Sequence, residues 1–445
     1  MRHYLSIPVL FLLMVLAYGA KSQESWSLQK CINYALENNI KIKQGALNSG
    51  YYDNELDQAK SNRLPNLNAR FSNDMSFGRS LSYDNTYQNI NSNNTGGSLS
   101  TSVTLWNGSI LANQVKKAEF DLKASLEDLQ KAKDDIMLNI AASYLEILFA
   151  DELVKVAADQ MEVTRQQIDR TTKLVDAGSL AKGSLLEIEA QLAREELQLV
   201  NEQNSLQLAY LRLYQLLELS STETFKIEKP EFPVLDAGQT MLNSMDIFKT
   251  AVDVRPEIKS AEYKLKSAEK QLAIAKGNQY PVLSFGGNYY NSYNNKYADV
   301  TGSSIPFSDQ IRNNERYGFG FDLAIPIFNR RQVKNGISNA QLQRTNYELQ
   351  LQDSKNLLRK DIEQAYTTAF AALKRYMANE KAVASMAEAF RYTEEKFNVG
   401  MVNPVEYNQS KNNLAKSRSD LLQAKYEYIF RTKILDFYAG KPISL

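Results

Sequence analysis

The chain has 445 residues, of which 43% are hydrophobic and 23% charged, enough material for two or three ordinary domains. Its 52 basic residues nearly balance 51 acidic ones, so composition does not indicate binding to nucleic acid. One histidine, His3, and one cysteine, Cys31, exclude a disulfide framework and leave no histidine cluster for a metal or catalytic site. A histidine-based metal or catalytic site is therefore not expected.

The N-terminal segment has the pattern of a secretory signal peptide. Arg2 precedes an apolar run from Leu5 to Ala17, and small residues follow at Gly19, Ala20 and Ser22. The run is shorter than the ~20 residues of a spanning helix, which favours removal of residues 1–22 by cleavage between Ser22 and Gln23 over a retained anchor. Loss of Arg2 and Lys21 leaves 50 basic residues against 51 acidic ones. No later run is long and apolar enough for a spanning helix, so membrane insertion would have to use strands.

The remaining sequence is a tandem duplication. Pro65 matches Pro281 at an offset of 216, together with other positions of the first helix and strand. Tyr144 matches Tyr366 at an offset of 222, as do positions from residue 106 to residue 213. A change of offset between residues 68 and 105 marks a loop that tolerates insertion. We predict two structural repeats, residues 23–235 and 236–445, each with a helix, two strands, a very long helix and a returning helix.

The first helix of each repeat ends before a proline and leads into a strand pair. The predicted pairs are 65–77 with 97–106, and 281–291 with 316–328. The last strand shows the alternation best, because large residues at every second position face away from Gly318, Gly320 and Asp322; they are Tyr317, Phe319, Phe321 and Leu323. Each segment is about as long as the 9 to 11 residues with which a tilted strand spans a membrane. Strands of soluble β-sandwich proteins show the same alternation, so the pattern fits both.

The long helices are predicted at 107–176 and 329–398, stretches without proline. At 1.5 Å per residue, a helix of this length is on the order of 100 Å long, which requires packing against other helices. Gly178 and Gly400 follow them, where a residue tolerant of positive φ ends a helix. The returning helices are predicted at 183–218 and 404–438, with Pro404 in the first turn. Cys31 is expected on the buried side of the first helix.

Four strands cannot close a barrel, and open strand edges cannot lie in lipid. Two chains would supply eight strands and three would supply twelve, and only twelve leave room for a passage. The aromatic face of the last strand would then contact lipid, and its glycine face would border a lumen.

The repeated strand pairs and long helices, with the turns LVDAGSLAKGSLLE and FNVGMVNPVEY, resemble the TolC-like outer-membrane efflux proteins over essentially the whole mature chain. The resemblance implies a mainly α protein with a membrane β-barrel. It would be a homotrimer with one 12-stranded barrel continuous with a long periplasmic helical tunnel. It also implies an outer-membrane location with a large periplasmic portion, a periplasmic adaptor, an inner-membrane pump, and neither catalysis nor cofactor.

The resemblance also assigns roles to individual residues. The tip glycines match Gly178 and Gly400, which with Pro404 mark the ends expected to dock the adaptor. The acid that narrows the tunnel mouth matches Glu406, while a second acidic position falls on Gln409 and an aspartate partner falls on Ser184. The tyrosine and arginine of the closing latch fall on Phe397 and Val402, so the polar latch of the family is not expected in the same form.

Two other classes remain open at this stage. A secreted or surface coiled-coil adhesin would account for the long helices but not for a strand pair at the same point of both repeats. An exported hydrolase would need a catalytic motif, and the sequence has no GxSxG, P-loop or HExxH pattern.

Overall fold

The computed structural model describes residues 25–81, 85–219, 225–230, 232 and 243–443. The chain divides into two compact units. Unit 1 comprises the described residues of Met1–Leu47, Glu127–Lys259 and Asp353–Leu445, and unit 2 comprises those of Asn48–Leu126 and Ser260–Gln352. Each unit draws on both predicted repeats, because the long helices pass from one unit into the other. Within the described residues, none of the helices combines the length and the apolar character that crossing a membrane requires.

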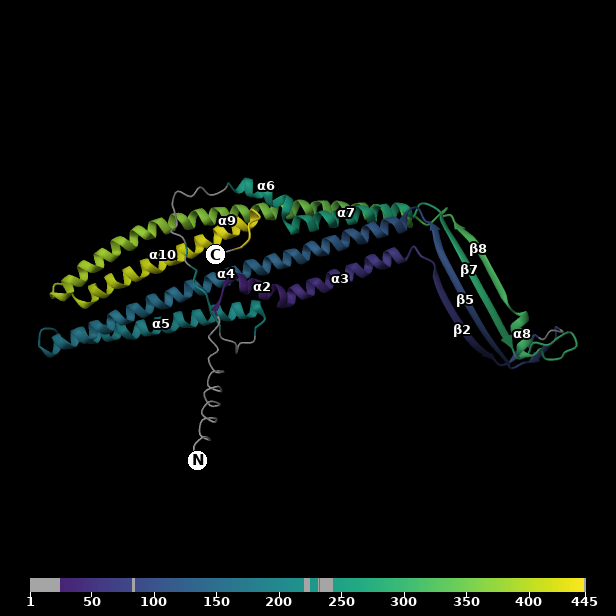
Figure 1. Cartoon of the computed structure of the whole chain (residues 1–445), viewed down its shortest axis with the longest axis horizontal. Coiled ribbons are helices and arrows are strands. Elements are labelled where there is room, and N and C mark those ends of the chain that lie inside the picture. The colour runs from purple at the N-terminus through teal and green to yellow at the C-terminus, as the bar shows by residue number, and fades with distance from the viewer. Residues whose placement is uncertain (1–24, 82–84, 220–224, 231, 233–242, 444–445) are drawn as a thin grey trace, which may run out of the picture. The chain divides into compact units, whose positions relative to one another are not determined.

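The same order of elements occurs twice along the chain (Figure 1). The first series is α2 (Leu28–Asn38), α3 (Ile40–Ser61), β2 (Asn66–Ser76), β5 (Ser92–Trp106), α4 (Ile110–Asp176) and α5 (Lys182–Leu217). The second is α6 (Ser244–Val254), α7 (Pro256–Gly277), β7 (Val282–Asn294), β8 (Arg316–Ala324), α9 (Gln332–Asn398) and α10 (Pro404–Tyr438). Equivalent residues cap the N-termini of α2 and α6. Ser27 and Asn243 each accept a hydrogen bond from a backbone amide of the first turn.

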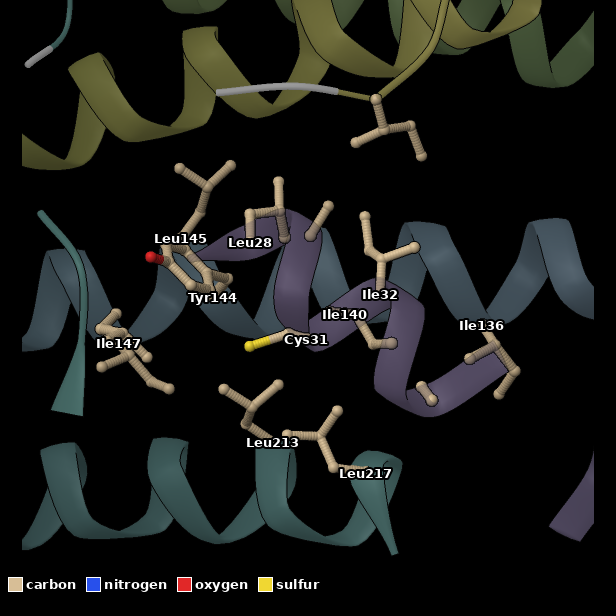
Figure 2. Packing of buried hydrophobic residues seen from close by; sticks show 14 of the residues in the cluster. Leu28, Cys31, Ile32, Ile136, Ile140, Tyr144, Leu145, Ile147, Leu213 and Leu217 are labelled. Atoms are coloured by element: carbon tan, nitrogen blue, oxygen red, sulfur yellow. The ribbon is translucent and has the colours of Figure 1, made fainter. Parts of the chain in front are cut away.

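The core of unit 1 forms where α2 lies between α4 and α5 (Figure 2). Cys31 is fully buried there, as predicted, between Ile140 of α4 and Leu213 of α5. Burial raises the pKa of its thiol to about 12, so the side chain acts as a small apolar group. Tyr144 donates its hydroxyl to the carbonyl oxygens of Glu228 at 2.7 Å and Trp26 at 3.1 Å. It thereby holds the short parallel pair β1 (Ser25–Trp26) and β6 (Lys226–Ile227) against the core.

A buried ion pair fixes the equivalent helix of the second repeat. Arg255, just after α6, lies 3.0 Å from Asp134 of α4, and the two side chains are 9% and 7% exposed. Its guanidinium also covers the ring of Phe437 at 4.3 Å. Burial raises the pKa of Asp134, and Arg255 opposes that shift. Arg255 thus links the end of α6 to α4 through the ion pair and to the end of α10 through the ring of Phe437.

Unit 2 contains a four-stranded antiparallel sheet in the order β2, β5, β7, β8. Each repeat supplies one neighbouring pair, and the pairing of β5 with β7 joins them (Figure 1). Strands β2 and β8 are therefore its two edges. The connections contain a short hairpin, β3 (Arg79–Leu81) with β4 (Tyr87–Asn89), and the helix α8 (Phe307–Asn313), none of which the sequence predicted.

Several predicted boundaries need correction. The strand predicted at 316–328 ends at Ala324, because Pro326 lacks the amide hydrogen that continued pairing requires. The strands predicted at 97–106 and 281–291 are longer, spanning Ser92–Trp106 and Val282–Asn294. The long helices predicted from 107 and 329 begin three residues later. Residues 108–109 and 330–331 have consecutive positive φ angles, so the chain makes a non-helical turn there before each long helix begins.

Candidate channel surfaces

Equivalent turns reverse the two helical hairpins of unit 1. Gly178 has φ +74°, and Ser179 donates its amide to the carbonyl of Leu174 at 2.8 Å. Gly400 has φ +77°, and Met401 donates to Lys396 at 2.9 Å. Both are six-to-one hydrogen bonds of a helix that ends in a left-handed residue. The space around both glycines is open, so the backbone angle rather than crowding makes a side chain unfavourable there.

The start of α10 contains three of the predicted site residues. Asn403 caps the helix by accepting a hydrogen bond from the backbone amide of Glu406 at 2.9 Å. Pro404 is the first helical residue and is buried, whereas the side chain of Glu406 is exposed. Gln409, one turn further, is exposed and donates to Asn413 at 3.0 Å. Ser184, the equivalent of Glu406 in the first repeat, is half-buried near the start of α5.

A cavity of about 680 Å³ lies between the two turns, and we call it the tip cavity. Its lining includes Leu174, Ser179 and Ser184 from the first hairpin and Gly400 and Pro404 from the second. Val399, Met401 and Val405 expose most of their side chains beside these residues. Apolar side chains are thus concentrated at the end of the second hairpin.

The residues at the latch positions pack in an apolar cluster. Phe397 is buried with its ring centre 4.8 Å from that of Tyr407, and Ile188 of α5 completes the cluster. Val402 packs against the same group and is half-buried. At this level the two hairpins contact each other through aromatic and aliphatic side chains, and Arg170 of α4 also donates to the carbonyl of Asn398 at 3.5 Å.

Next to the cluster, a layer of buried polar side chains joins the two repeats. The sequence did not predict this layer. Lys411 of α10 forms an ion pair of 2.6 Å with Glu195 of α5, and the two side chains are 5% and 7% exposed. The Lys411 ammonium also donates to Thr164 and to the carbonyl of Gln160 on α4. Glu195 accepts from Thr164 at 2.5 Å and from Gln191 at 2.8 Å. Burial lowers the pKa of Lys411, and Glu195 partly offsets that shift.

The sheet of unit 2 has two chemically distinct faces. Directly paired residues of antiparallel strands share a face, and the register places Tyr317 beside Tyr289 and Phe321 beside Phe285. The four residues predicted for this face of β8 are all strongly exposed: Tyr317 79%, Phe319 81%, Phe321 72% and Leu323 57%. The apolar face continues over β5 and β2 through the pairing of Leu99 with Tyr289 and with Ala69. The opposite face carries serine, asparagine and glycine residues, such as Ser100 between Asn68 and Asn288.

Two predicted features need separate mention. The signal peptide and its cleavage point at Ser22 and Gln23 lie outside the described residues. Among the residues that the structure describes, no group of three or more histidine, cysteine, aspartate or glutamate side chains is placed to hold a metal ion.

Two long helical hairpins, one from each repeat, together with a four-stranded, two-faced sheet make up the fold of outer-membrane channel proteins. The family model described as outer membrane efflux protein matches residues 31–218 and 248–441. The chain belongs to that family. The two matched segments correspond to the two repeats of the chain. The family consists of channels rather than enzymes.

Individual relatives agree with this assignment. The outer membrane protein TolC of Escherichia coli is 23% identical over 443 residues, which cover 95% of this chain and 84% of that protein. Toxin and drug export protein A of Aggregatibacter actinomycetemcomitans is 24% identical over 340 residues, covering 75% and 70% of the two chains. The solved structure of CusC superposes with a TM-score of 0.80 at 18% identity and covers 96% of each chain. These matches favour an efflux channel over the coiled-coil adhesin that the sequence left open.

Proposed function

We propose that this protein is the exit duct of a tripartite efflux or secretion system. Three copies would form one passage through the outer membrane and a periplasmic tunnel leading to it. The observation that carries the proposal is the four-stranded sheet with one continuous apolar face and two unpaired edges. A periplasmic adaptor and an inner-membrane pump would deliver the substrate, and the pump would supply the energy.

The sheet supports this proposal through the chemistry of its faces and edges. A face of tyrosine, phenylalanine and leucine side chains suits contact with lipid, and a face of serine, asparagine and glycine suits a water-filled lumen. The edge strands β2 and β8 present unpaired backbone groups, which are costly in lipid. Pairing of β8 in one copy with β2 of the next removes both edges in a closed ring, and twelve strands leave an open interior.

The proposal is tested by the mass and conductance of the membrane-extracted protein. Native mass measurement should give three copies, and insertion into a planar lipid bilayer should produce discrete conductance steps. A stable soluble monomer without conductance would refute the proposal.

The turns at Gly178 and Gly400 are proposed as the ends that dock the adaptor. Supporting observations are the exposed apolar side chains of Val399 and Met401 beside the tip cavity. Replacement Gly400→Val should sharply reduce export of a toxic substrate in cells with the adaptor and pump, while the trimer still assembles. A β-branched residue resists φ +77°, at a cost of about 1–3 kcal/mol, and would shift the helix reversal.

The matched control is Gly183→Val, near the same end of unit 1. Gly183 lies within α5, has open space around it and is not in the left-handed region, so valine is tolerated. Export should be retained in this variant. Equal export by both variants at equal expression would argue against docking through the turn at Gly400.

Glu406 is proposed to form an acidic ring at the periplasmic mouth, one carboxylate from each copy, with Gln409 and Ser184 beside it. Its exposed side chain at the start of α10 supports access to such a mouth. Two carboxylates ~8 Å apart in water repel by only about 0.5 kcal/mol, so the ring would bias ion passage rather than close the channel.

Replacement Glu406→Gln should therefore reduce the preference of the channel for cations. Single-channel recording under a salt gradient measures this as a shift of the reversal potential toward zero. Glu363→Gln removes an exposed carboxylate in the middle of α9 and serves as the control. A reversal potential that Glu406→Gln leaves unchanged would exclude the ring.

A further inference from the structure

The tip cavity has walls from both helical hairpins of unit 1. Leu174 and Leu180, which are half-buried, line it from the first hairpin. Phe397 and Pro404, which are buried, line it from the second. Its volume of about 680 Å³ falls in the range of about 300–1,000 Å³ that is typical of sites for drug-sized molecules.

The lining of the tip cavity contains no charged side chain among the residues that the structure describes. Its side chains are apolar, hydroxyl or amide groups, in a chain of which 23% of the residues are charged. Another cavity of unit 1, of about 500 Å³, differs because Asp134, Arg255 and Lys441 line it. An ionised molecule in the tip cavity would lose hydration without gaining a counter-charge, whereas an uncharged molecule has no such penalty.

A few polar side chains lie among the apolar ones. Ser179 and Asn398 are exposed at the cavity, and Ser184 is half-buried. Within the described part of the chain, none of these three side chains forms a hydrogen bond with another residue. Hydroxyl and amide groups can both donate and accept hydrogen bonds. The cavity therefore suits a molecule with an apolar body and an uncharged group that donates or accepts a hydrogen bond.

We propose that the tip cavity binds an uncharged, drug-sized amphipathic molecule. Its apolar body would lie against Leu174, Phe397 and Pro404, and its polar group would reach Ser184 or Asn398. Because both hairpins line the cavity, a bound molecule would stabilise this arrangement of the two hairpins. The inference goes beyond the proposed exit duct and does not depend on the number of copies, since one chain supplies the whole lining.

Protection of an engineered cysteine tests the inference in the membrane-extracted, full-length protein. The reporter variant is Ser184→Cys, and the rate at which a maleimide labels it is measured with and without a probe. Cys31 should not react in the folded protein, because its thiol is fully buried. The probe is N-phenylnaphthylamine, an uncharged aromatic molecule with one N–H donor. At about ten times its dissociation constant, the probe should slow labelling about tenfold.

Two matched controls separate charge from position. Anilinonaphthalene sulfonate has the same aromatic rings with an added sulfonate, and it should leave the labelling rate of Ser184→Cys unchanged. The second control is Ser205→Cys. Ser205 is exposed and lies about 30 Å further along α5 than Ser184. N-phenylnaphthylamine should not slow labelling there in the same detergent.

Each outcome has a defined meaning. Slower labelling of Ser184→Cys with the uncharged probe alone would support the assigned site and class of molecule. Equal protection by both probes would overturn the class of molecule. No protection by the uncharged probe, or equal slowing of Ser205→Cys, would overturn the site. Native mass and conductance test the proposed function independently, so either proposal can fail without the other.

Discussion

Replacement of Lys411 by methionine is expected to lower the free energy of unfolding by about 3–5 kcal/mol, the cost of leaving one partner of a buried ion pair alone. The Glu195 carboxylate would remain in a site where its side chain is 7% exposed, without the ammonium group 2.6 Å away. Methionine keeps nearly the same volume, so lost packing contributes little. The helical circular dichroism signal of the detergent-solubilised protein, followed during denaturation by urea, measures the loss.

Two further variants separate burial from charge. In Lys411→Met with Glu195→Leu, both charges are absent and most of the lost stability should return. Lys173→Met breaks an ion pair of the same 2.6 Å length with Asp169, but there the side chains are 73% and 70% exposed. That change should cost at most about 1 kcal/mol. Similar losses for Lys411→Met and Lys173→Met would show that burial of the first pair has no energetic consequence.

Replacement of Phe319 by arginine is expected to lower the free energy of unfolding of the membrane-inserted barrel by about 2–4 kcal/mol. This is the penalty for a cation on the lipid face near the bilayer midplane. Phe319 lies near the middle of β8, is 81% exposed in the chain and belongs to the proposed lipid face. The fraction of protein that migrates as an undissociated trimer on a gel without heating should fall.

The control Ser100→Arg places the same side chain on the opposite face of the sheet. Ser100 lies in β5 between Asn68 and Asn288, on the face proposed to border the lumen, where water can solvate a guanidinium. Trimer yield should be close to that of the unmodified protein, although conductance can change. A larger loss of trimer with Ser100→Arg than with Phe319→Arg would reverse the assignment of the two faces.

Local patterns in the sequence predicted the long helices, the helix reversals and the four strands of the sheet, but not β3, β4 or α8. The alternation around Phe319 and Phe321 predicted a two-faced strand, and the register of the sheet confirms one apolar face across all four strands. The glycines at 178 and 400 predicted the helix reversals, because a positive φ is required within a few residues of a helix end. Where local backbone angles departed from the pattern, as at residues 330–331, the predicted helix boundary was wrong.

Only the tertiary structure determined which elements contact one another. Lys411 donates to the carbonyl of Gln160, 251 positions earlier in the chain, and no local periodicity specifies a partner at that distance. Its position one turn after Tyr407 and three residues before Leu414, on the buried side of α10, was a signal that the sequence contained. The identity of its partner was not contained there. Periodicity states that a side chain is buried, whereas the choice of Glu195 depends on how α4, α5 and α10 pack together.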